Sequence, residues 1–191
     1  MMFNRFFRTA AAVALLAPGL ASAAIADNAT PAASAGDPTQ SPAIELAAAT
    51  QPPNVARGKI VFQTTANCVN CHGWPGDGIT GKNPRSPGIA ANLRETQLDT
   101  NSMIQVVSCG IPGSAMPYHD ALAYKDKRCY GTTMADYTTG MPPQRGNVIG
   151  AQDIINVVAY VQQKIKGRGP ITKAECLEYF GKPVAACNDY Q

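Results

Sequence analysis

The 191-residue sequence predicts an all-α domain in which short helices are joined by long loops. Apolar residues recur at helical spacing in several segments, whereas no segment alternates as a half-buried β-strand does. The stretches between these segments are dense in glycine and proline, of which the chain has 17 and 15, and such stretches are typical of loops.

The first residues have the pattern of an export signal. Arg5 and Arg8 give a positive start, an apolar run follows, and Ala, Ser and Ala at 21–23 form a small-residue cleavage pattern. The apolar run is shorter than the about 20 residues of a spanning helix, which weighs against an uncleaved anchor. We therefore predict a signal peptide at residues 1–23 and export to the periplasm.

Residues 24–54 are rich in Ala, Pro, Ser and Thr and contain no aromatic side chain. Such a segment buries too little apolar surface to fold. We therefore predict a disordered leader here and one domain over residues 55–191, which ends in a C-terminal helical extension. Without the two arginines of the signal, 14 of the 16 basic residues remain against 13 acidic ones, so no basic field favours nucleic acid.

The first predicted helix covers residues 54–66, with Asn54 as its N-cap. Gly58 within it leaves the backbone bare, so that another helix can approach closely. A second helix is predicted over residues 101–109 and is ended by Gly110.

The third predicted helix, residues 151–165, has the clearest apolar stripe of the chain, formed by Ile154, Ile155, Val158, Ala159 and Val161. Thr172 and Glu175 stand at the two ends of a capping box. This pattern predicts a last helix, which ends at Gly181.

Cys68-Val69-Asn70-Cys71-His72 is the most specific motif in the sequence. Two thiols three residues apart at a helix end can reach the two vinyl groups of one porphyrin, and the adjacent histidine then lies beneath its iron. An ordinary disulfide or a zinc half-site is the alternative, but the chain has no second close CxxC or HxxxH to complete a zinc site. The motif therefore predicts one covalent haem c, bound by Cys68, Cys71 and the iron ligand His72.

The second axial ligand is predicted to be a methionine sulfur, a soft ligand that favours reduced iron. Met116 follows a short helix and lies in a stiff loop that contains proline, and we favour it. Met141 stands beside two prolines in a similar setting, and His119 is the only histidine outside the motif; an open position is the remaining alternative. Met103 and Met134 lack such a setting and are expected to be packing residues.

The porphyrin also needs an apolar wall that excludes water. The candidates are the large apolar residues near the motif and on the predicted helices: Phe62, Trp74, Leu93, Met103, Ile104, Val107, Ile155, Val158 and Tyr160. Arg85 and Arg94 are candidate partners for a haem propionate.

Four of the six cysteines lie outside the haem motif, in a chain that is predicted to reach an oxidising compartment. Four cysteines allow three pairings. We favour the local one, which joins Cys109 to Cys129 and Cys176 to Cys187.

The glycine-bearing first helix, the CxxCH motif, the methionine before proline and the helix IINVVAYVQQKI together resemble class I cytochromes c over residues 55–166. This resemblance implies the small class I cytochrome c fold around one covalent haem, with a haem edge exposed. It also implies a protein that carries single electrons and is not an enzyme.

Three stretches are more similar to the cytochrome cL group, the electron acceptors of quinoprotein methanol dehydrogenase: VVSCGIPGSAMPYHDALAYKDKRCYG, the helix named above and KGRGPITKAECLEYFG. In that group the methionine that corresponds to Met116 is the iron ligand. The resemblance implies a pyrroloquinoline-quinone alcohol dehydrogenase as electron donor, and another cytochrome c or an oxidase as acceptor. Some members hold calcium near the haem, which makes calcium a candidate second cofactor.

The loops PGDGITGKNPRSPG and TTGMPPQRGN differ from that group, so the alcohol stays open between methanol, ethanol and others. Two other functions also stay open. A haem enzyme such as a peroxidase needs an open iron position and a distal acid–base group, for which only His119 is available. A tethered cytochrome subunit of a larger respiratory complex would keep the leader as its tether.

Overall fold

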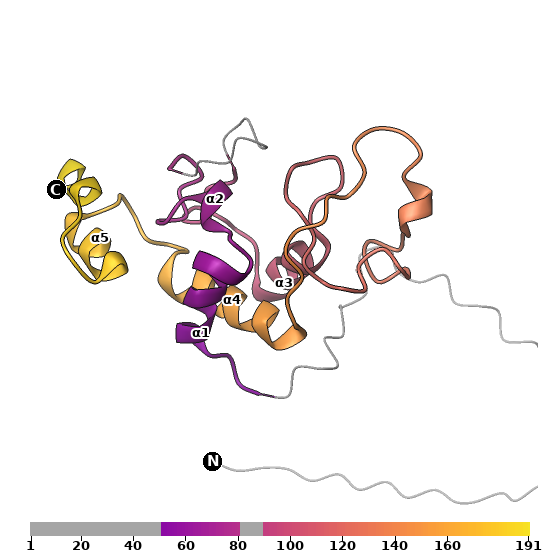
Figure 1. Cartoon of the computed structure of the whole chain (residues 1–191), viewed down its shortest axis with the longest axis horizontal. Coiled ribbons are helices and arrows are strands. Elements are labelled where there is room, and N and C mark those ends of the chain that lie inside the picture. Colours follow the sequence, from indigo (N-terminus) through magenta and orange to yellow (C-terminus); the bar gives the residue numbers. More distant parts are fainter. Residues whose placement is uncertain (1–50, 81–89) are drawn as a thin grey trace, which may run out of the picture. The chain divides into compact units, whose positions relative to one another are not determined.

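The structure, a computed structural model, describes residues 51–80 and 90–191 (Figure 1). The predicted signal peptide, most of the predicted leader and Arg85 lie outside the described residues. All the described residues fall within one unit of the chain, residues 37–191.

The described chain consists of helices and loops without a β-strand, which confirms the predicted all-α class. In chain order the α-helices are α1 (Val55–Ile60), α2 (Val69–His72), α3 (Thr100–Cys109), α4 (Ala151–Lys164) and α5 (Lys173–Phe180). α1 runs directly into a π-helical turn, Val61–Thr65, and 3₁₀ turns form at Met134–Asp136 and Ala185–Asp189. None of the described helices is long and apolar enough to cross a bilayer.

α1 crosses α4 at the glycine that the sequence singled out (Figure 1). Asn54 caps α1 as predicted, because its side-chain oxygen accepts a hydrogen bond from the Arg57 N–H. A Cβ atom on Gly58 would run into the carbonyl group of Asn156 and would lie 2.8 Å from Cβ of Tyr160. The missing side chain therefore permits the close approach, which confirms the prediction for Gly58.

The last residues of the predicted leader are held against α4. The Gln51 N–H donates to the side-chain oxygen of Gln152 at 3.1 Å, and the Asn54 N–H donates to that of Asn156 at 2.8 Å. Residues 51–53, which we expected to be disordered, are therefore part of the folded domain together with the predicted cap Asn54.

One large apolar cluster joins the π-helical turn, α3 and α4. Its buried members are Val61, Phe62, Ala66, Met103, Ile149, Ile154, Val157, Val158, Tyr160, Val161 and Ile165. The rings of Phe62 and Tyr160 pack with centroids 5.6 Å apart. Of the predicted stripe of α4, Ile154, Val158 and Val161 belong to this cluster, whereas Ala159 is buried outside it and Ile155 is only partly buried.

The two disulfides join Cys109 to Cys129 and Cys176 to Cys187, which confirms the local pairing. The first one fixes the end of α3 and the second one closes the C-terminal extension. Each bond constrains a loop that lies largely outside the main apolar cluster.

Arg94 anchors the C-terminal extension. Its side chain is 5% exposed and donates to both carboxylate oxygens of Glu175, at 2.7 and 3.0 Å. The remaining donors bond to the carbonyl oxygens of Gly169 and Pro75. Since a guanidinium has five N–H donors and all five are engaged within the protein, the suggestion that Arg94 binds a propionate was wrong.

α5 starts where the capping pattern predicted, but only the Thr172 half of the predicted capping box forms, because the Glu175 carboxylate binds Arg94 instead. The Thr172 hydroxyl accepts a hydrogen bond from the Glu175 N–H at 3.2 Å. The extension also packs on Trp74, whose ring centroid lies 5.1 Å from that of Tyr179 and 5.6 Å from that of Phe180. This gives Trp74 a packing role that was not foreseen, and its place in the haem pocket stays a prediction.

Candidate haem site

The cysteines and the histidine of the CxxCH motif lie on one turn of helix. Asn67 turns the chain after the π-helical turn with a positive φ of 59°, and α2 follows with Cys68 as its N-cap residue. The N–H groups of Cys71 and His72 both donate to the Cys68 carbonyl oxygen, at 3.1 and 2.9 Å. Thiols three positions apart on a helical turn face the same side, as attachment to one porphyrin requires.

His72 is oriented for metal ligation. Its side chain is buried, and its Nδ1 lies 2.9 Å from the carbonyl oxygen of Ala91. A carbonyl can only accept, so Nδ1 carries the hydrogen and Nε2 keeps a lone pair for a metal. Burial lowers the pKa of His72, although the Ala91 carbonyl opposes that shift, so the neutral ring is favoured. No sequence pattern marks Ala91, because any residue can offer a backbone carbonyl.

The surroundings of Cys68 suit a thioether better than a zinc-bound thiolate. Cys68 and Val69 pack against the apolar cluster, and burial raises the pKa of the Cys68 thiol to about 12. Cys68 and Cys71 lie outside both disulfides. Over residues 51–80 and 90–191, no group of three His, Cys, Asp or Glu side chains forms a metal site. These residues therefore fit covalent haem rather than zinc.

Met116 closes a tight turn directly after α3. Its carbonyl oxygen accepts a hydrogen bond from the Ile111 N–H at 3.1 Å, and its N–H donates to Ser114 Oγ at 3.2 Å. A Cβ atom on Gly110 would lie 2.6 Å from the Met116 carbonyl oxygen, so the turn packs on the backbone of the helix end. Met116 thus lies in a stiff, anchored loop, as the sequence predicted.

The two alternative ligands have less suitable surroundings. Met141 is 50% exposed. His119 is 3% exposed, and its Nδ1 lies 2.7 Å from the Asn147 carbonyl oxygen, to which it donates. A Cβ atom on Gly146 would lie 2.7 Å from Cε1 of His119, so protein encloses this ring. These observations favour Met116 among the three candidates.

The two remaining methionines differ from each other. Met103 is 5% exposed in the apolar cluster, which confirms it as a packing residue. Met134 is 40% exposed, so the prediction that it packs in the interior was wrong. It begins a 3₁₀ turn that is held by reciprocal hydrogen bonds between Thr133 and Asp136, and these polar bonds need no apolar burial.

Most of the predicted wall residues belong to the apolar cluster. Phe62, Met103, Val158 and Tyr160 are buried in it, and Leu93, Ile104 and Val107 pack against it. Ile155 is partly buried on α4. Because Cys68 and Val69 contact the same cluster, the CxxCH motif and α3, which leads to Met116, border one apolar surface.

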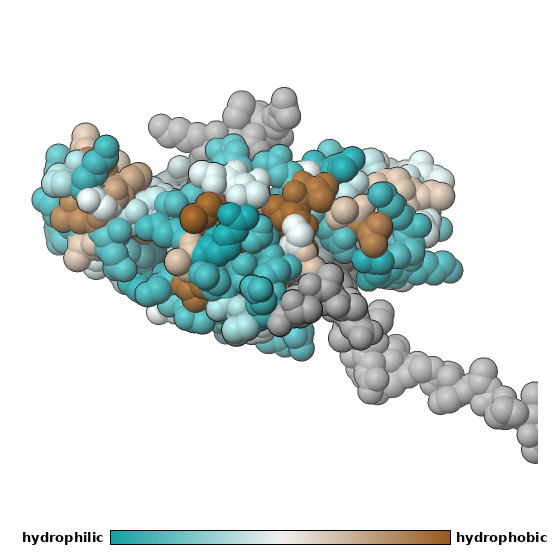
Figure 2. Space-filling view, turned by 60° about the horizontal axis from the view of Figure 1, so that its bottom comes forward, coloured by the Kyte–Doolittle hydropathy of each residue, from teal (hydrophilic) through white to brown (hydrophobic). Residues whose placement is uncertain are grey.

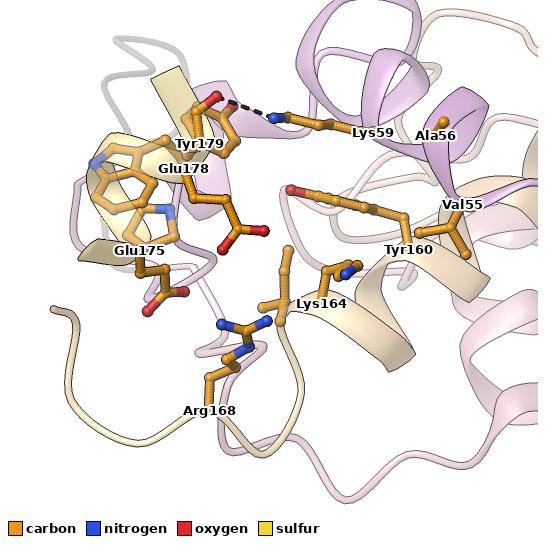
Figure 3. A pocket seen from close by; sticks show the side chains of 12 residues that line it. Val55, Ala56, Lys59, Tyr160, Lys164, Arg168, Glu175, Glu178 and Tyr179 are labelled. Atoms are coloured by element: carbon orange, nitrogen blue, oxygen red, sulfur yellow. Dashed lines mark hydrogen bonds between the residues drawn. The ribbon is translucent and has the colours of Figure 1, made fainter. Parts of the chain in front are cut away.

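A cavity of about 220 Å³ lies between α1, α4 and α5 (Figure 3). Its lining includes none of the four predicted haem-binding residues. Lys59 reaches from α1 to the Tyr179 carbonyl oxygen at 3.0 Å, and the ring of Tyr160 extends into the cavity from α4 (Figure 3). The cavity is therefore a seam between the apolar core and the C-terminal extension, and not the haem site.

Comparison with known proteins identifies a family whose model matches this chain. The family model described as Cytochrome c matches residues 55–164, more than half of the chain. A search of curated proteins and a search of solved structures found no match. The matched range runs from the start of α1 to the end of α4, so it includes the CxxCH motif and Met116 but not the C-terminal extension.

Proposed function

Because the chain belongs to the cytochrome c family, we propose that it is a periplasmic one-electron carrier whose haem is held by Cys68, Cys71, His72 and Met116. The family carries haem c and transfers electrons. The observation that best supports this ligand set is the 2.9 Å hydrogen bond between Nδ1 of His72 and the Ala91 carbonyl. It fixes the tautomer in which the other ring nitrogen is a metal ligand.

Bound haem c supplies an iron that alternates between the ferric and the ferrous state. In this proposal, Cys68 and Cys71 would hold the porphyrin and His72 and Met116 would bind its iron, so that little would rearrange when an electron moves. The apolar cluster beside Cys68 excludes water, which favours the less charged ferrous form.

The setting of His119 supports a carrier over a peroxidase. A distal acid–base group has to reach a ligand on the open side of the iron and exchange protons with it. The His119 ring is 3% exposed, and a Cβ atom on Gly146 would lie 2.7 Å from its Cε1 and 3.0 Å from its Nδ1, so the backbone of another loop lies along this edge of the ring. It is better explained as a structural residue of the loop behind Met116.

We further propose a pyrroloquinoline-quinone alcohol dehydrogenase of the methanol type as donor, and another cytochrome c or an oxidase as acceptor. The similarity to the cytochrome cL group supports this pair. Calcium near the haem stays a prediction of the same similarity, which leaves the alcohol open between methanol, ethanol and others.

Exposed apolar side chains near the Met116 turn support a docking surface there. Ile111, whose N–H bonds to the Met116 carbonyl, is 44% exposed. Tyr130, whose hydroxyl bonds to the Gly110 carbonyl, is 39% exposed. Figure 2 shows separate hydrophobic patches, in brown, on a mostly hydrophilic face of the molecule.

Stopped-flow mixing tests the donor. Oxidised holoprotein is mixed with reduced quinoprotein alcohol dehydrogenases, namely calcium- and lanthanide-dependent methanol enzymes and an ethanol enzyme. At least one should reduce the haem, and Ile111→Lys should slow that reaction about tenfold through loss of docking. Ile60→Lys, on α1 and at a similarly exposed position, is the matched control and should keep the rate. If none of the enzymes reduces the wild type, the donor assignment is wrong, although the haem ligands are unaffected.

A further inference from the structure

Three non-glycine residues of the described chain have a positive φ: Asn67, Tyr124 and Tyr130, at 59°, 59° and 55°. Bulky residues rarely adopt this conformation, and it persists only where the surroundings impose it, often at functional sites. Asn67 directly precedes Cys68 of the haem motif. The two tyrosines lie in the loop closed by the Cys109–Cys129 bond or directly after it.

Both tyrosine hydroxyls bond to the end of α3. The Tyr124 hydroxyl donates to the Cys109 carbonyl oxygen, and the Tyr130 hydroxyl donates to the Gly110 carbonyl oxygen, each at 2.7 Å. Carbonyls at a helix end lack partners within the helix, so these side chains satisfy two of them. Burial raises the pKa of Tyr130, so its hydroxyl keeps the hydrogen that it donates.

Gly110 connects Tyr130 to the methionine turn. Its carbonyl is held by Tyr130, and a Cβ atom on it would lie 2.6 Å from the Met116 carbonyl oxygen and 2.7 Å from the Pro117 carbonyl carbon. The next residue, Ile111, donates its N–H to the Met116 carbonyl oxygen. A shift of the Gly110 peptide therefore shifts the surface on which Met116 rests.

The two tyrosines differ in what else they do. Tyr124 is 3% exposed and packs edge-on against Tyr118 and Tyr137, so it also builds a small core. Tyr130 is 39% exposed, and its hydroxyl bonds to Gly110. Its positive φ belongs to a two-residue turn with Gly131, which the Thr132 N–H closes by donating to the Cys129 carbonyl oxygen at 3.0 Å. Core packing does not explain its hydroxyl bond to Gly110.

We infer that Tyr130 is a positioning residue for Met116, which holds the Gly110 peptide so that the methionine sulfur stays on the iron. This inference rests on the proposed function, in which Met116 is an iron ligand. Without the Tyr130 hydroxyl, the turn is freer to move and an outside ligand displaces the sulfur more easily.

Imidazole titration of oxidised holoprotein tests this role. Tyr130→Phe should keep the haem and the weak far-red band of sulfur on ferric iron, but bind imidazole about threefold to tenfold more tightly, as expected for one lost hydrogen bond. Tyr137→Phe is the matched control, because it removes a hydroxyl of the same cluster that bonds to Thr132 Oγ1 instead. Its imidazole affinity should equal that of the wild type.

A second variant separates the hydroxyl from backbone strain. Asn tolerates a positive φ, so Tyr130→Asn relaxes the backbone while it removes the hydroxyl, and it should show the same gain in imidazole affinity. Wild-type affinity in Tyr130→Phe, or an equal gain in Tyr137→Phe, would overturn the inference. A wild type without the far-red band would instead reject Met116 as a ligand, and the positioning role with it.

Discussion

The backbone of Gly58 lies directly against the carbonyl group of Asn156, where α1 crosses α4. A methyl group on residue 58 would collide with that carbonyl and would lie 2.8 Å from Cβ of Tyr160. A backbone carbonyl and a Cβ atom of a packed helix cannot move aside without moving the helix. Gly58→Ala should therefore lower the free energy of unfolding by about 1–3 kcal/mol, although alanine is the better helix former.

Urea unfolding followed by helical circular dichroism measures this loss. Gly169→Ala is the control, since a Cβ atom there meets no atom within 4 Å and the free energy should stay within about 0.5 kcal/mol. Equal stability of Gly58→Ala and the wild type would show that the helices do not cross at this point.

The pair between Arg94 and Glu175 predicts how firmly the C-terminal extension is attached. Their side chains are 5% and 15% exposed, and removal of one partner leaves the other charge buried. Glu175→Gln should therefore lower the free energy of unfolding by about 3 kcal/mol. Glu178→Gln changes an exposed carboxylate of the same helix and should have almost no effect. Similar losses in the two variants, measured by urea unfolding, would count against the pair as the anchor.

The two disulfides should have separable effects. We consider two double variants: Cys109 and Cys129 both replaced by alanine, and Cys176 and Cys187 both replaced by alanine. Each should lower the free energy of unfolding by about 3 kcal/mol in the chain-entropy model. Only the first pair fixes the end of α3 next to Met116, so only its loss should weaken the far-red band of the oxidised holoprotein. Weakening of the band by loss of the Cys176–Cys187 bond alone would contradict this division.

His119 should make stability depend on pH. Burial lowers its pKa in the fold, whereas the unfolded chain takes up the proton near pH 6.5, as a free histidine does. Below that pH the unfolded state binds more protons than the folded state. The free energy of unfolding therefore falls by up to about 1.4 kcal/mol for each unit by which the pH is lowered, and this contribution of His119 vanishes above about pH 7.

His119→Gln keeps a donor for the Asn147 carbonyl and removes the titration. The difference in free energy of unfolding between the wild type and this variant should shrink as the pH falls from 7 to about 5.5. A difference that does not change with pH would show that His119 titrates alike in both states.

Local signals in the sequence predicted the features that depend on a few neighbouring residues. Thr172 caps α5 by its own hydroxyl, Gly58 marks the helix crossing by lacking a side chain, and the disulfides form between cysteines near in sequence. In each case the interaction is specified within the segment or by residue type alone.

Other features depend on the assembled fold and could not be read in advance. Arg94 looks like any loop arginine, and only the fold brings Glu175 and Gly169 to it. The Ala91 carbonyl that orients His72 has no residue signature. Likewise, Tyr130 stands before Gly131 as in many turns, and its bond to Gly110 arises only once the chain has returned to the end of α3.

The absorption spectrum of the oxidised holoprotein, recorded for the wild type, Met116→Ala and Met141→Ala, tests the proposed carrier most directly. The wild type and Met141→Ala should show the weak far-red band of sulfur on ferric haem, and Met116→Ala should lack it. The reason is that Met116 lies in the anchored turn after α3, whereas Met141 is 50% exposed. Loss of the band in Met141→Ala alone would contradict Met116 as the ligand. A wild type that shows no such band, and that binds carbon monoxide at once when reduced, would contradict the six-coordinate carrier itself.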